Sequence, residues 1–450
     1  MNDPRSGEVI SAHVVFWHDI LKFMEQLYFV QAGTADKRVN TLPLPDELIG
    51  ELLRYVAAHE VGHTLGLRHN HRASSAYSVK QLRDPAFTNT QGTVASIMAY
   101  GRFNSVAQPS DGVTSFVPKI GPYDEFAIEW GYKVLNDKAL NRKTAEAEIA
   151  ELDLMAARQI DEPLLRFGGE DMAATFDPEV LTENIGRERI DATKLSIASL
   201  ERAAARLIPA TTRLGEDYTT LQSTYRMLIS QRLNYLSSVV KQIGGVRENR
   251  FLGGRGGDSF TRTTPREQKA AIRYLLDDAL NTPKWLTDPA VLNRIRVFDV
   301  AAPVITTQNQ ILTSMMSPLR FRLLEDAEMV KHGSGMEANQ YLSTIQSGVF
   351  RELKSGKPVV DVYRRELQRA YIEQLKGFSG ETQRINNANA AQAFMFSDIS
   401  IDLRPAAIQS LKDLKRDLQN AQAKISDQPT RLHIAQLDRE ITQILKIRGD

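Results

Sequence analysis

Residues 59–69 constrain this chain more than any other stretch of its sequence. They read His-Glu-Val-Gly-His-Thr-Leu-Gly-Leu-Arg-His. On a helix, His59 and His63 project from the same face, where two imidazoles can bind one metal ion. Gly66 can end that helix in a left-handed conformation, so that the chain turns back and His69 supplies a third nitrogen. Three protein ligands with one open position are typical of catalytic rather than structural zinc.

Glu60 follows the first histidine directly and is placed to reach a water molecule on such a metal. It is therefore the candidate general base, because a carboxylate at hydrogen-bond distance can take a proton from water. His71 is an alternative third ligand, although the interval between Gly66 and His69 favours His69. The other interpretation is a polar helix end with solvated histidines. That does not explain why two histidines and a glutamate share a helix that has an apolar stripe.

A second motif follows at residues 96–100, which read Ser-Ile-Met-Ala-Tyr. With both motifs in place, the chain resembles the metzincin clan of zinc endopeptidases. The resemblance implies that Met98 lies beneath the zinc-bound histidines, in the clan's Met-turn. It also implies that Tyr100 can bind the metal or the tetrahedral intermediate. Tyr123 and Asp124 are similar to the opening of the clan's C-terminal helix.

A closer resemblance is to large bacterial zinc-dependent metalloproteases, which share the sequence form of residues 3–8 and 59–70. It implies a long helical region after the catalytic part and a periplasmic, cell-surface or secreted location. The β-branched and aromatic run at 8–17 predicts a strand, either at the cleft edge beside extended substrate or inside the sheet. One strand and one helix before His59 make a small N-terminal subdomain, so we expect that further parts of it lie upstream.

Composition excludes several classes of protein. The net charge of +1 gives no reason to invoke nucleic acid as a partner. There are no cysteines, so disulfides and thiolate metal sites are excluded. The sequence contains no apolar run long enough to span a membrane, and no signal peptide. It does not indicate an oligomeric state.

The predicted fold is mainly α. Residues 1–135 would form a metzincin-like catalytic portion with a short sheet, the active-site helix and the Met-turn. Apolar stripes predict helices at 20–32, 46–66 and 120–135, and almost only helices afterwards. Residues 136–450 would form a large helical region, which the glycine-rich stretch at 244–264 could divide into two subdomains. His433, on a helix near the C-terminus, is expected at the surface.

These patterns predict a zinc-dependent metallopeptidase that cleaves peptide or protein substrates. Zinc on His59, His63 and His69 would acidify a bound water, with Glu60 as the base. A gluzincin-type enzyme, with a distant glutamate as third ligand, is disfavoured because His69 is already suitably spaced. The alternative from another class is a helical interaction scaffold with a structural or vestigial zinc site.

Overall fold

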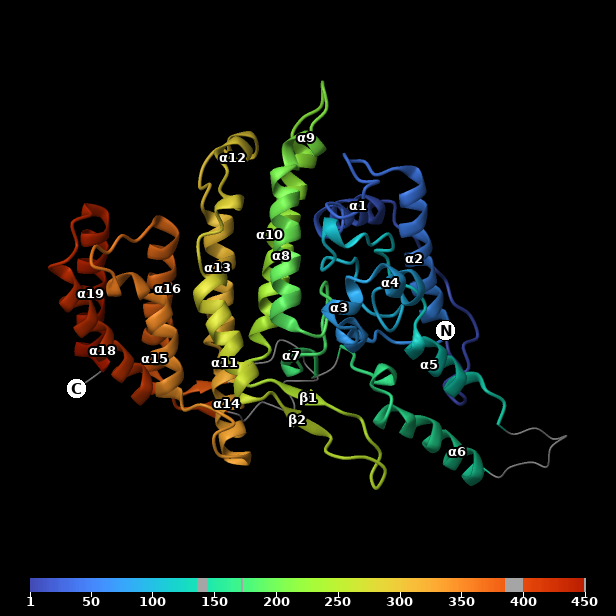
Figure 1. Ribbon diagram of the computed structural model, residues 1–450. Coiled ribbons are helices and arrows are strands. Elements are labelled where there is room, and N and C mark those ends of the chain that lie inside the picture. The colour runs from blue at the N-terminus through green and yellow to red at the C-terminus, as the bar shows by residue number, and fades with distance from the viewer. Residues whose placement is uncertain (136–144, 171–172, 385–399, 449–450) are drawn as a thin grey trace. The chain divides into compact units, whose positions relative to one another are not determined.

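The structure, a computed structural model, describes residues 1–135, 145–170, 173–384 and 400–448 (Figure 1). The chain divides into two compact units. Unit 1 comprises Met1–Ser238 and Val246–Thr261, and unit 2 comprises Val239–Gly245 and Arg262–Asp450. This division differs from the boundary predicted at residue 135, because later segments pack within unit 1. The predicted mainly α fold is confirmed. Among the described residues, no helix combines the length and the apolar character needed to cross a membrane.

Unit 1 is built from helices and one small hairpin. Its elements are α1 (Asp19–Gln31), α2 (Asp46–Thr64), α3 (Val79–Leu82), α4 (Pro85–Gln91), α5 (Pro122–Tyr132), α6 (Ala145–Ala157), α7 (Ala173–Phe176), α8 (Arg189–Ala205), α9 (Leu207–Thr211), most of α10 (Thr219–Val240), β1 (Val246–Glu248) and the greater part of β2 (Phe260–Arg262). β1 and β2 pair with each other inside the stretch that the sequence marks as a glycine-rich loop.

Helix α2 places the first metal-ligand candidate in the core. Leu48, Leu52, Tyr55, His59 and Gly62 are its buried residues. Their three- and four-residue spacing makes them one face of the helix. The same face that packs the helix into unit 1 therefore carries one of the histidines, which holds that imidazole in a rigid setting.

The predicted strand at 8–17 is not formed. Within residues 1–135, the strand pairing in the structure is an isolated bridge between Asn2 and Val9. The short sheet expected in the catalytic portion is therefore absent from this part of the chain. The apolar side chains of Val15 and Trp17 are exposed. A strand is stabilised by hydrogen bonds to a neighbouring strand, and β-propensity alone does not replace them.

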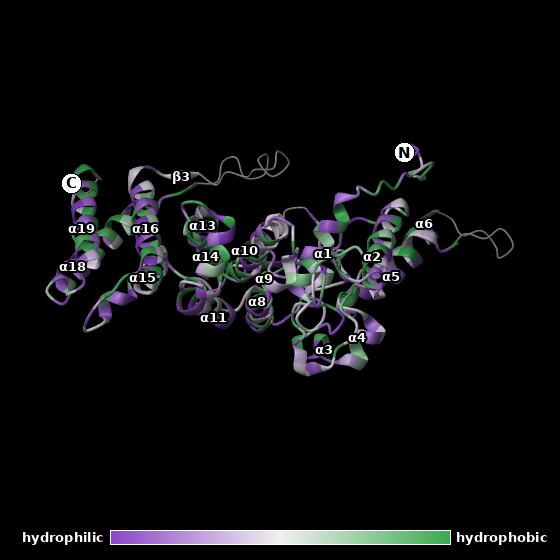
Figure 2. Cartoon of the chain, turned by 90° about the horizontal axis from the view of Figure 1, so that it is seen from above, coloured by the Kyte–Doolittle hydropathy of each residue, from purple (hydrophilic) through white to green (hydrophobic). Residues whose placement is uncertain are grey.

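Unit 2 is a set of packed helices. Its remaining elements are α11 (Pro265–Tyr274), α12 (Pro289–Ile295), α13 (Ala302–Met315), α14 (Pro318–Val330), α15 (Ala338–Val349), α16 (Val362–Gly380), β3 (Gln383–Arg384), β4 (Ser400–Ile401), α18 (Arg404–Gln422) and α19 (Gln428–Arg448). Helices α16, α18 and α19 pack against one another (Figure 1). Figure 2 shows hydrophobic and hydrophilic residues along each of them, as amphipathic helices have.

His433 on α19 is buried, so its predicted surface position is wrong. Its Nε2 lies 2.9 Å from Oε1 of Gln368 on α16. Burial lowers the pKa of His433 to about 3, and the nearby Arg369 and Arg365 add to this. In the unfolded chain the same side chain has a pKa of about 6.5. Below that pH, the unfolded state therefore binds a proton that His433 in the folded state does not.

We expect His433 to make unit 2 less stable in acid. Because its pKa is depressed by folding, its contribution is complete above pH 6.5 and is lost as pH falls toward 3. Between pH 7 and pH 5 the loss amounts to about 2 kcal/mol. Urea unfolding of the wild type and of His433→Gln at both pH values measures it. The variant should lose less stability than the wild type over this range, and an equal loss in the two proteins would contradict the assignment.

Candidate metal centre

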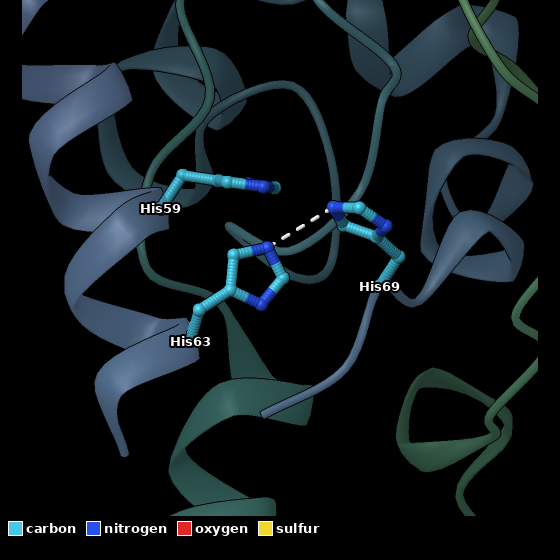
Figure 3. A group of neighbouring side chains, drawn as sticks. All are labelled: His59, His63 and His69. Carbon is cyan, nitrogen blue, oxygen red and sulfur yellow. Dashed lines mark hydrogen bonds between the residues drawn. The ribbon is translucent and has the colours of Figure 1, made fainter. Parts of the chain in front are cut away.

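His59, His63 and His69 lie together in unit 1. One ring nitrogen from each is within 4.8 Å of those of the other two. In Figure 3, His59 and His63 extend from α2 and His69 extends toward them from the segment that follows. Gly66 makes this return possible, since its φ of +82° is the left-handed conformation that the sequence predicts there. The structure thus brings together the three histidines predicted as ligands.

Each of these imidazoles is held by its Nδ1 atom. His59 Nδ1 lies 2.8 Å from the carbonyl oxygen of Ile97, and His63 Nδ1 lies 2.8 Å from that of Leu67. His69 Nδ1 lies 2.5 Å from a carboxylate oxygen of Glu170. These oxygens only accept hydrogen bonds, so each Nδ1 carries the proton and each Nε2 offers a lone pair. This is the tautomer that metal-binding histidines adopt.

The Nε2 atoms fit a metal ion. Those of His63 and His69 are 3.1 Å apart, the contact that Figure 3 draws as a dashed line. With both Nδ1 protons already donated, two lone pairs face each other there, and only a proton or a cation between them makes the contact favourable. Two nitrogens at about 2.0–2.1 Å from one tetrahedral zinc are about 3.3 Å apart. His59 Nε2 is buried and has no hydrogen-bond partner among the described residues. Burial also lowers the pKa of His59 to about 4, which keeps its ring neutral, as a metal ligand requires.

The ring of Tyr100 lies beside these histidines, and Glu60 follows His59 directly on α2. Glu60 is half-buried on α2. The ring centroid of Tyr100 is 4.4 Å from that of His69 and 5.3 Å from that of His59. The guanidinium group of Arg102 lies over the Tyr100 ring, with its central carbon 4.1 Å from the ring centroid. Burial raises the pKa of the Tyr100 phenol, the Arg102 charge opposes this, and the Glu60 charge adds to it. Tyr100 therefore borders the histidine cluster, and Glu60 lies one residue after His59 on α2.

Met98 packs against the face of α2 that carries the histidines. Its side chain is fully buried, and a Cβ atom built on Gly62 would lie 2.3 Å from the Met98 sulfur. A glycine between the two helical histidines is what lets the methionine approach this closely. The backbone of Met98 also holds the segment that carries His69. The backbone N–H of Asn70, the residue after His69, donates a hydrogen bond to the Met98 carbonyl oxygen at 3.1 Å.

Asp124, in the first turn of α5, fixes the segment that orients His59. Its carboxylate accepts hydrogen bonds from the Ser96 hydroxyl at 2.6 Å, the Ile97 amide at 2.7 Å and the Gly121 amide at 2.8 Å. Burial raises the pKa of Asp124, and these three donors oppose that shift. Since the Ile97 carbonyl accepts from His59, the aspartate acts on the histidine through a single residue. The sequence places Asp124 at the helix start but gives no sign of this contact.

His71, the alternative ligand, is buried but belongs to a different group of side chains. Its Nε2 lies 3.6 Å from the Glu170 carboxylate oxygen that contacts His69. The group that includes His59 and His63 is completed by His69. The sequence does not predict a role for Glu170. The paired glycines 168 and 169 just before it are the available signal, because adjacent glycines often mark a close backbone approach.

The glycine turn after α2 and the three facing imidazoles form a group that could hold a metal ion. The sequence profile of the Met-zincin family matches residues 41–357. The chain therefore belongs to this family of metzincin-type zinc metalloproteases. The match covers α2, the histidine cluster and a large part of unit 2. Among curated proteins and among solved structures, the chain has no match.

Proposed function

We propose that this chain is a zinc-dependent endopeptidase in which His59, His63 and His69 hold the metal. The observation that carries the proposal is that an oxygen holds the Nδ1 atom of each ring, while one ring nitrogen of each lies within 4.8 Å of those of the other two. When bound there, zinc supplies a Lewis acid and lowers the pKa of a water molecule toward about 7.

Glu60 is the general base in this proposal. It takes a proton from the water that attacks the peptide carbonyl carbon, and it later delivers a proton to the leaving amine nitrogen. Its place on α2, one residue after His59 and near Tyr100, supports this role. The Tyr100 phenol donates a hydrogen bond to the carbonyl oxygen as negative charge develops on it. Arg102, stacked on the Tyr100 ring, holds that ring in place.

The loop at residues 96–100 serves as the Met-turn in this proposal. Met98 supports the histidine-bearing face of α2 through its contact with Gly62. The loop also presents the Ile97 carbonyl to His59. Support of this kind keeps the ligands close to one productive geometry, which a metal site needs for both affinity and rate.

Metal removal tests the proposed function. We expect the purified chain to contain about one zinc ion and to cleave a denatured protein, since extended backbone fits a peptidase cleft. A strong chelator should abolish cleavage, and added zinc should restore it, because the ligands are present without the metal. Metal analysis measures the zinc content, and gel electrophoresis measures the cleavage. A chain that keeps its zinc but leaves denatured proteins uncut would instead favour a helical scaffold with a structural zinc site.

A further inference from the structure

Residues 166–170, named the strap here, lie against the segment that carries His69. The Asn70 side-chain amide donates to the Arg166 carbonyl at 3.0 Å, and its oxygen accepts from the Gly168 amide at 3.0 Å. The Arg72 amide donates to the Gly168 carbonyl at 3.1 Å. Asn70 is fully buried, so these bonds form away from solvent. The strap is therefore fixed beside the third histidine although it comes from a distant part of unit 1.

The close approach depends on a small residue in the strap. A Cβ atom on Gly169 would lie 3.1 Å from the His69 carbonyl oxygen and 2.9 Å from the Phe167 ring. Any larger residue at this position would press on both atoms, so glycine favours the close course of the backbone past His69. The next residue, Glu170, is thereby brought to the Nδ1 side of the His69 ring.

We propose that Glu170 is a positioning residue for the third metal ligand. Its carboxylate accepts a hydrogen bond from the Nδ1–H group of His69 and so keeps Nε2 turned toward His63 and His59. The other two histidines are oriented by backbone carbonyls, whereas His69 is oriented by a charged side chain. A carboxylate in this place also makes the imidazole a stronger electron-pair donor to the metal. The inference rests on the proposed function, because it concerns the same zinc site.

The test is zinc affinity, measured by competition between the full chain and a chromogenic chelator. We expect Glu170→Gln to weaken zinc binding about 10- to 100-fold, as loss of such a partner typically does. Unfolding of the metal-free chain should be unchanged, because the Glu170 side chain is 59% exposed. Glu162→Gln is the matched control. That exposed glutamate lies on the same stretch of chain but pairs with Arg158 at 3.1 Å, so zinc binding should not change.

A second pair of variants shows whether Glu170 acts through His69. In a His69→Ala background, adding Glu170→Gln should weaken zinc binding no further, because the ring that the carboxylate orients is gone. An equal loss in both backgrounds would mean that Glu170 acts elsewhere and would overturn the inference. So would a Glu170→Gln chain with wild-type zinc affinity. A wild-type chain that binds no zinc would overturn the proposed function itself. If the wild-type chain binds zinc but cleaves no peptides, the peptidase function is overturned, and the zinc affinities of the Glu170 variants still decide the inference.

Discussion

Replacing Glu60 by glutamine is expected to leave zinc bound and to slow peptide-bond hydrolysis about 10²- to 10⁴-fold, the usual contribution of a general base. Glutamine has nearly the same shape as glutamate but cannot take a proton from water. The ligands are unaffected, because their Nδ1 partners are Ile97, Leu67 and Glu170 rather than Glu60. Metal analysis and the steady-state rate of peptide cleavage measure the two effects separately.

Glu47→Gln is the control for this experiment. Glu47 is an exposed glutamate in the first turn of the same helix, α2. It can contribute a favourable interaction with the helix dipole but lies well before the histidines. Its replacement should change neither zinc content nor turnover. If Glu60→Gln cleaved peptides at nearly the wild-type rate, the general-base role would be wrong.

The second large effect is expected for Asp124→Ala. It removes the acceptor of three buried donors, the Ser96 hydroxyl and the amides of Ile97 and Gly121. A buried donor left without a partner costs about 1–3 kcal/mol, so we expect unit 1 to lose roughly 3–5 kcal/mol of unfolding free energy. Zinc affinity should fall as well, because the Ile97 carbonyl that orients His59 is no longer fixed. Urea unfolding and chelator competition measure these losses.

Two further variants separate the role of Asp124 from a general effect on α5. Asp124→Asn keeps an acceptor oxygen of similar position, so its losses should be smaller than those of the alanine variant. Glu125→Ala changes the neighbouring, exposed residue in the same helical turn. It should cost about 0.3–1 kcal/mol through the helix dipole and leave zinc binding unchanged. Equal losses for Asp124→Ala and Glu125→Ala would contradict the bridging role of Asp124.

The ligands themselves could be predicted because their geometry is local. His59 and His63 are one helical turn apart, and Gly66 allows the return to His69, so the spacing alone brings the three rings together. The helix that carries them could be predicted for the same reason, since its buried residues repeat at helical spacing. Interactions within a short stretch leave a pattern in the sequence.

The groups that orient the ligands could not be predicted, because they come from distant segments. The Ile97 carbonyl is a backbone atom and leaves no residue-type signal. Asp124 looks like an ordinary acidic residue at a helix start, and Glu170 belongs to a stretch without periodicity. The strand predicted at 8–17 is wrong for a related reason, since a strand needs a partner that local propensity cannot supply.

The dependence of His69 on the strap has a consequence for the order of events during synthesis. A ribosome that has translated residue 69 has already made all three metal ligands. Leu67, whose carbonyl contacts His63, has then been made as well, whereas the partners of His59 and His69 follow later, at residues 97 and 170. Domains fold as units while the chain emerges. A nascent chain that ends before the strap therefore lacks the carboxylate that contacts His69, and we expect it to hold zinc more weakly than the finished protein.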